Sequence, residues 1–77
     1  MNYNYKVYFC YYVRETKTKR FIGNAENMDE AITMVAHDAE NEFPVATTIV
    51  RDKNEFGHTT ITYNRRNKRY YVLEPIN

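Results

Sequence analysis

The feature that most constrains the fold of this 77-residue chain is a single amphipathic helix pattern in its middle. Asn27 can cap the first turn, and Glu30 stands where its side chain can return the capping hydrogen bond. Apolar residues then recur at steps of three and four and form one stripe: Met28, Ala31, Ile32, Val35, Ala39 and Phe43. Pro44 ends the pattern, so one helix is predicted between Asn27 and Pro44.

Strand-like runs lie on both sides of this helix. Before it, YNYKVYFCYYV alternates in the manner of a strand, and KRFIGNA can pair back on it across the polar turn ETKT. After it, VATTIVRD, HTTITYN and KRYYVLE are joined by the short turns KNEFG and RRN, which predicts a meander that Pro75 closes. The sequence therefore predicts one α+β domain over residues 1–77, of order β-β-α-β-β-β, with an antiparallel sheet of four to five strands and one helix packed on one face.

The first strand has aromatic residues on both of its faces. One face is expected to be the core face: Tyr3, Tyr5, Val7, Phe9, Tyr11 and Val13. The other face carries Tyr8, Cys10 and Tyr12. Because a single helix can cover only one face of a sheet, we expect this second face to be left to solvent or to a partner.

Charge is sorted along the chain although the formal net charge is only +1. Residues 1–25 carry a net charge of +4, residues 26–44 carry −6 and residues 45–77 carry +3. The acidic residues of the helix, among them Asp29, Glu30 and Glu40, could engage a basic groove on a target. The small net charge disfavours a dedicated nucleic-acid binder.

Several classes of site are disfavoured by what the sequence lacks. Cys10 is the only cysteine, so no internal disulfide can form, and a reduced cytoplasmic setting is expected. His37, His58 and Cys10 stand far apart and in none of the close pairs typical of zinc sites, so no metal is predicted. Glycine-rich phosphate loops are absent, and no cofactor is expected. A membrane span or a secretory leader is not expected either.

Basic and aromatic residues are interleaved at both ends of the chain. RRNKRYY places Arg65, Arg66, Lys68 and Arg69 beside Tyr70 and Tyr71, and Arg14 follows Tyr8 and Tyr12 near the N-terminus. Cations neutralise phosphates and rings stack on bases, so this pattern indicates a platform for single-stranded RNA or DNA. Tyrosine and arginine are also enriched in protein interfaces, and a solvated face without a partner is a third reading.

The stretch FGHTTITYNRRNKRYYVLEP resembles part of the HicA family of toxin ribonucleases. The resemblance implies that His58 is a catalytic histidine and that Arg65, Arg66 and Lys68 form an RNA-contacting turn. The chain departs from the family pattern in three ways. No serine stands between Gly57 and His58, no closing helix follows, and an N-terminal hairpin is added.

The chain has the outline of a hairpin, a capped helix and a second hairpin. In this outline it is similar to small accessory proteins of phages and mobile elements, including anti-CRISPR proteins. That resemblance implies a non-enzymatic inhibitor that occludes a surface of a host protein or protein–nucleic-acid complex. The chain is expected to be a monomer or a homodimer, because a meander with an unprotected edge can dimerise through that edge. Direct binding of single-stranded RNA or DNA and a ribonuclease that uses His58 are the alternatives. The residues expected to carry binding are Tyr8, Tyr12, Arg14, Arg65, Arg66, Lys68, Arg69, Tyr70, Asp29, Glu30 and Glu40.

Overall fold

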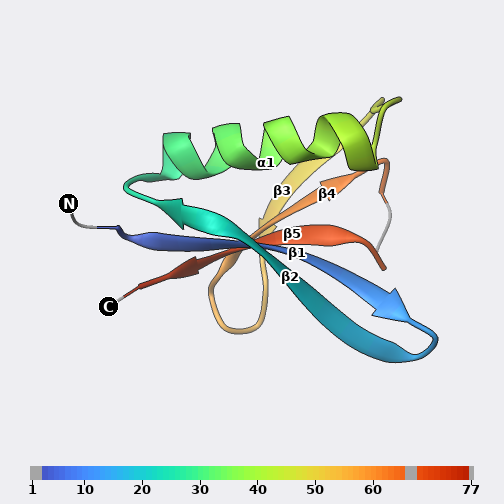
Figure 1. The fold of residues 1–77 in the computed structure, drawn as a ribbon, viewed down its shortest axis with the longest axis horizontal. Coiled ribbons are helices and arrows are strands. Elements are labelled where there is room, and N and C mark those ends of the chain that lie inside the picture. The colour runs from blue at the N-terminus through green and yellow to red at the C-terminus, as the bar shows by residue number, and fades with distance from the viewer. Residues whose placement is uncertain (1–2, 66–67, 77) are drawn as a thin grey trace.

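The computed structural model, which describes residues 3–65 and 68–76, confirms an α+β fold of order β-β-α-β-β-β with one antiparallel sheet (Figure 1). Along the chain the elements are β1 (Tyr5–Val13), β2 (Thr16–Ala25), α1 (Met28–Glu42), β3 (Ile49–Lys53), β4 (Thr59–Tyr63) and β5 (Tyr70–Pro75). No helix in the described ranges is long and apolar enough to cross a membrane.

The five strands lie in the order β2-β1-β5-β4-β3, so the first and last strands of the chain are neighbours. β5 pairs with β1 in a register that sets Cys10 beside Tyr70. This register brings the connection before β5 close to the outer part of the β1–β2 hairpin. Two basic segments that are far apart in sequence are thereby placed at the same end of the sheet.

The helix begins where the sequence predicts. The side-chain Oδ1 of Asn27 accepts a hydrogen bond from the backbone N–H of Glu30 at 2.8 Å. At the other end the N–H of Phe43 donates to the carbonyl oxygen of Ala39 at 2.8 Å. α1 packs across β1 and β2, and at Gly23 the approach is so close that a Cβ would lie 2.6 Å from Cε of Met34.

The core lies between α1 and the sheet. Its most fully buried members on the sheet are Val7, Ala25, Tyr71 and Leu73. Two of the residues expected on the core face of the first strand, Tyr3 and Val13, are instead exposed. They lie at or beyond the ends of β1, outside the stretch in which Val7 and Phe9 join the core cluster.

Candidate functional site

The sheet face opposite α1, which we call the open face, carries the even-numbered residues of β1 and their cross-strand neighbours. Tyr8 lies opposite Phe21 of β2, with ring centroids 5.6 Å apart in an edge-to-face arrangement. Further along, Tyr12 lies opposite Lys17, and Tyr70 of β5 lies beside Cys10. Tyr8, Cys10 and Tyr12 therefore share one face of β1, and Tyr12, near the end of the strand, also borders a pocket that Glu42 of α1 lines.

Lysines of β2 lie over the rings of this face. Nζ of Lys19 is 4.3 Å from the ring centroid of Tyr8 and 2.8 Å from Oε2 of Glu74. Nζ of Lys17 is 5.3 Å from the ring centroid of Tyr70. The stems of long basic side chains can cover apolar surface in this way while their charged ends stay in water.

Cys10 lies at the centre of the open face and is only 1% exposed, although no helix in the described chain covers it. Burial raises the pKa of its thiol above the ordinary value of 9.0, although Lys17 and Lys19 act to lower it. The thiol is therefore protonated at neutral pH, which does not suit a nucleophile. Cys10 acts as a small packing residue between the lysines and Tyr70.

The margins of the open face expose larger aromatic rings. Phe21, Tyr12 and Phe56 are 52%, 42% and 73% exposed. Phe56 belongs to the β3–β4 loop, which helps to line a shallow concavity of about 330 Å³ on this face together with His58 and Cys10. The sequence analysis did not single out Phe21 or Phe56. The alternation of KRFIGNA could have identified Phe21 had the hairpin register been known.

A second concavity, the cationic pocket, lies where the β1–β2 hairpin, the end of α1 and the connection before β5 meet. Its volume is about 530 Å³. It is lined by Phe9, Tyr11, Tyr12, Arg14, Arg20, Glu42, Lys68 and Arg69. The pocket unites Tyr12 and Arg14 with Lys68 and Arg69, which the sequence analysis placed in two separate segments.

Part of the charge in this pocket is neutralised within the protein. Arg20 donates to both carboxylate oxygens of Asp38 at 3.0 and 2.9 Å, and Arg69 donates to Oε1 of Glu42 at 2.7 Å. The hydroxyl of Tyr71 also donates to Asp38 at 2.8 Å. The acidic and basic segments of the sequence are thus not kept apart in space, and Arg69 anchors the end of α1.

The ionisation of this network follows from its contacts. Burial acts to raise the pKa of Asp38, but hydrogen bonds from Arg20 and Tyr71 outweigh it, so this pKa lies below its ordinary value of 3.8. Burial and the bond to Asp38 hold the pKa of Tyr71 well above its usual range. Tyr71 therefore remains a hydrogen-bond donor, and Asp38 remains charged at neutral pH.

Turns beside the pocket contain non-glycine residues in the left-handed backbone region. Arg14, between β1 and β2, has φ 60°, and Asn64 and Arg65, after β4, have φ 58° and 56°. Asn64 is held there because its side chain accepts from the N–H of Thr47 at 2.8 Å and donates to the carbonyl of Val45 at 2.9 Å. Such strained positions cluster at functional sites in many proteins.

The remaining predicted site residues are spread over the surface. Asp29, Glu30 and Glu40 are exposed on α1, and Arg65 is exposed at its turn. Arg66 lies outside the described residues.

His58 is half-buried just before β4, whereas Arg65 lies just beyond its other end. A five-residue strand spans about 17 Å, so the histidine and the turn expected from the HicA resemblance are well separated. Among the described residues no group of three or more His, Cys, Asp or Glu could hold a metal.

Comparisons of this chain with protein-family models, with curated proteins and with solved structures found no match.

Proposed function

We propose that this protein is a non-enzymatic interaction protein that binds a partner protein through its open face. The observation that carries the proposal is the exposure of Phe21, Tyr12 and Phe56 around a face that no described helix covers. Aromatic rings bury a large area at little cost in side-chain entropy, and they are enriched among the residues that dominate binding energy in protein interfaces. Lysines between the rings add contacts for carboxylates on the partner.

A protein partner suits this face better than a row of stacked bases. A base needs access to the flat face of an aromatic ring. The ring of Tyr8 already has Lys19 over its face and Phe21 against it, and Lys19 is paired with Glu74. Stacking on Tyr8 would displace an existing cation–π contact and an ion pair.

The resemblance in outline to anti-CRISPR and other accessory proteins extends the proposal to a partner class, a host complex that handles nucleic acid. Such complexes present basic surfaces, which attract the exposed carboxylates of Asp29, Glu30 and Glu40. α1 and the open face lie on opposite sides of the sheet, so one flat surface cannot contact both (Figure 1). In this proposal the carboxylates steer the approach, and the open face forms the lasting contact.

Affinity capture from a bacterial lysate tests the proposal when it is made with matched variants. The wild-type protein and Val45→Ser, which alters a 75% exposed residue outside the open face, should retain the same stoichiometric protein partner. Phe21→Ser and Phe56→Ser should each lose it while keeping the wild-type unfolding temperature. The absence of any stoichiometric partner, or its equal retention by all four proteins, would rule the proposal out.

The cationic pocket supports a second candidate, the binding of single-stranded RNA or DNA. The specific observation is that Arg14 and Lys68 stand beside the rings of Tyr11 and Tyr12 in one concavity. A titration with labelled oligonucleotide decides this case, because a fourfold rise in salt should weaken binding about 2.6-fold for each phosphate contacted on a single strand. Arg14→Ala and Lys68→Ala should weaken binding, and Lys6→Ala, which lies outside the pocket, should not.

A further inference from the structure

β3 is an edge strand, and none of the described strands pairs with its outer side. It ends the sheet order β2-β1-β5-β4-β3, and all five of its residues are exposed. An edge strand presents a row of backbone N–H and C=O groups that can pair with another chain. The question is which groups of β3 point outward, and which strand they could accept.

The alternation of the hydrogen bonds between β3 and β4 shows which backbone groups of β3 point outward. The carbonyl of Thr48 accepts from the N–H of Asn64 at 2.7 Å, and the N–H of Asn54 donates to the carbonyl of His58 at 2.9 Å. In an antiparallel pair the bonded residues recur at every second position. The even-numbered residues of β3 therefore face β4, and the backbone groups of Ile49, Arg51 and Lys53 face outward.

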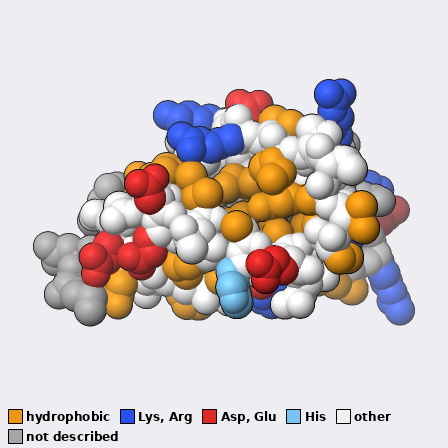
Figure 2. All heavy atoms as spheres, turned by 90° about the horizontal axis from the view of Figure 1, so that it is seen from above, with side chains coloured by type: hydrophobic (Ala, Val, Ile, Leu, Met, Phe, Trp, Pro, Cys, Tyr) orange, Lys and Arg blue, Asp and Glu red, His pale blue; other side chains and the backbone are white. Residues whose placement is uncertain are grey.

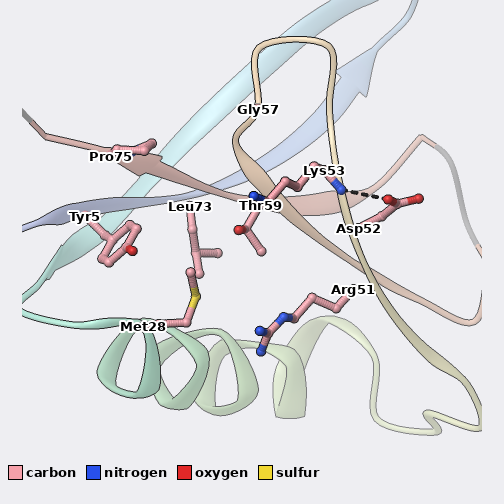
Figure 3. A pocket seen from close by; sticks show the side chains of 9 residues that line it. All are labelled: Tyr5, Met28, Arg51, Asp52, Lys53, Gly57, Thr59, Leu73 and Pro75. Carbon is pink, nitrogen blue, oxygen red and sulfur yellow. Dashed lines mark hydrogen bonds between the residues drawn. The ribbon is translucent and has the colours of Figure 1, made fainter.

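One of these outward groups is already occupied. The N–H of Lys53 donates to Oδ1 of its neighbour Asp52 at 2.8 Å, the bond drawn in Figure 3. A carboxylate that accepts from an edge N–H occupies the place that a carbonyl of an added strand would take.

Arg51 and Lys53 place positive charge on the side of the sheet that α1 covers. Arg51 and Lys53 help to line a concavity of about 550 Å³ between β3 and the start of α1, and Arg51 extends toward the helix (Figure 3). Among the described residues neither of them makes an ion pair, in contrast to Arg20 and Arg69. From this side Figure 2 shows apolar side chains in the middle, with Lys and Arg along the upper margin and at the lower right.

We infer that β3 is a docking edge for an extended, acidic segment of a partner protein, which adds to the sheet as a sixth strand. The backbone of that segment pairs with the outward N–H and C=O groups of Ile49 and Arg51 and with the carbonyl of Lys53. Side chains directly opposite these residues lie on the same face, with Cβ atoms about 5 Å apart. Glutamate or aspartate opposite Arg51 and Lys53 would therefore complete two ion pairs that the protein itself leaves unmade.

A second copy of β3 does not meet this requirement. Only the odd-numbered residues of β3 have backbone groups that point outward. In an antiparallel contact between two copies, each odd-numbered residue must therefore lie opposite an odd-numbered residue of the other copy. The register with the greatest overlap sets Arg51 opposite Arg51, and a shift of one step in one direction sets it opposite Lys53. Like charges directly opposite one another destabilise a strand pair, so both of these registers are disfavoured, and an acidic strand suits the edge better than a second copy does.

The experiment is a titration of isotope-labelled protein with the peptide acetyl-TEVEVET-amide, followed by NMR. Saturable binding is expected, together with at least tenfold slower exchange of the amide protons of Ile49 and Arg51. The amides of Val50 and Asp52, which already bond to β4, should change little. A peptide with lysine in place of each glutamate should bind at least tenfold more weakly, and the Arg51→Glu/Lys53→Glu variant should reverse this preference.

A matched pair of variants tests the role of Asp52. Asp52→Ala frees the N–H of Lys53 and should bind the acidic peptide two- to threefold more tightly than Glu55→Ala, which removes one nearby negative charge only. Three results would overturn the inference: no saturable binding, binding without protection of the Ile49 and Arg51 amides, or equal affinity for both peptides. Protection of these amides that grows with protein concentration alone would assign the edge to a second copy instead. None of these outcomes depends on the open face, so this experiment tests the docking edge independently of the proposed function.

Discussion

The two hairpins that flank β5 are held in different ways. The β1–β2 hairpin lies under α1, with Gly23 against Met34 and Arg20 bonded to Asp38. α1 contacts mainly β1 and β2, whereas the β3–β4 hairpin pairs with the rest of the sheet through β5. Only its inner strand reaches the core: Ile61 and Tyr63 of β4 are buried, and Tyr63 stacks on Phe43 at 5.2 Å, while every residue of β3 is exposed. The first hairpin therefore carries most of the stabilising contacts, and the second keeps an edge available.

The largest expected effect is that of Tyr71→Ala on β5, because this residue supports both hairpins. Its buried ring lies 5.0 Å from that of Phe9 in the first hairpin and 5.9 Å from that of Tyr63 in the second. Removing it should lower the free energy of unfolding by about 3–5 kcal/mol. Urea denaturation measures this loss. The control Tyr71→Phe removes only the hydroxyl bond to Asp38 and should cost about 1.5–3 kcal/mol; equal losses would contradict this account.

The second effect concerns the ion network that ties α1 to the first hairpin. Asp38→Asn should lower the free energy of unfolding by about 1 kcal/mol at neutral pH, a modest value because Arg20 is 41% exposed. The folded pKa of Asp38 lies below its ordinary value of 3.8, so this stabilisation is present above that pH and is lost as pH falls through the folded pKa. The gap between wild type and Asp38→Asn should therefore close as pH falls from 6 to about 2.

Denaturation at several pH values gives the measurement. Glu40→Gln, which alters an exposed carboxylate of the same helix, should show no such gap. A difference between wild type and Asp38→Asn that persists at low pH would mean that the charge of Asp38 is not what stabilises the first hairpin.

A third and smaller effect tests how closely α1 approaches the first hairpin. Gly23→Ala places a methyl group 2.6 Å from Cε of Met34, which must move aside. The substitution should be about 1 kcal/mol less favourable in the wild-type background than in Met34→Ala. A double-mutant cycle measures this coupling. Zero coupling would show that Met34 moves without cost and that the contact does not hold the helix in place.

The smallest effect is expected in the second hairpin, at its outer strand. Ile49→Thr on β3 alters a residue that is 61% exposed and should change the free energy of unfolding by no more than about 0.5 kcal/mol. The same substitution at Ile61 on β4, which is 4% exposed, should cost about 2 kcal/mol. Thermal and urea unfolding compare the two. If Ile49→Thr lowered the free energy of unfolding as much as Ile61→Thr does, the two hairpins would not differ in the way described.

The order of the elements could be predicted from the sequence because its signals are local. The cap at Asn27, the apolar stripe and the stop at Pro44 all lie within one segment, and the structure places α1 between them. The two faces of β1 also followed from simple alternation. Strand neighbours could not be predicted in this way, because the pairing of β1 with β5 depends on contacts between the two ends of the chain.

The candidate site was predictable only in part. Tyr12, Arg14, Lys68 and Arg69 were recognised, but the pocket that unites them depends on the β1–β5 register. Arg69 pairs with Glu42, which is 27 residues away, so less positive charge is available to a ligand than the sequence indicates. The left-handed backbone conformation of Arg14 and Arg65 could not be predicted, because neither residue is a glycine. The exposed rings of Phe21 and Phe56 were missed because their surroundings depend on the hairpin registers.

The central pairing of β1 with β5 also has a consequence for synthesis on the ribosome. β1, β2 and α1 emerge first, yet the inner side of β1 has no neighbour until β5, the last strand, has been made. Contacts between residues so far apart in sequence form late and slow the folding of small domains. During translation the nascent chain therefore carries an unpaired strand rich in tyrosine, and the timing of translation relative to β5 docking sets how long it needs protection from aggregation.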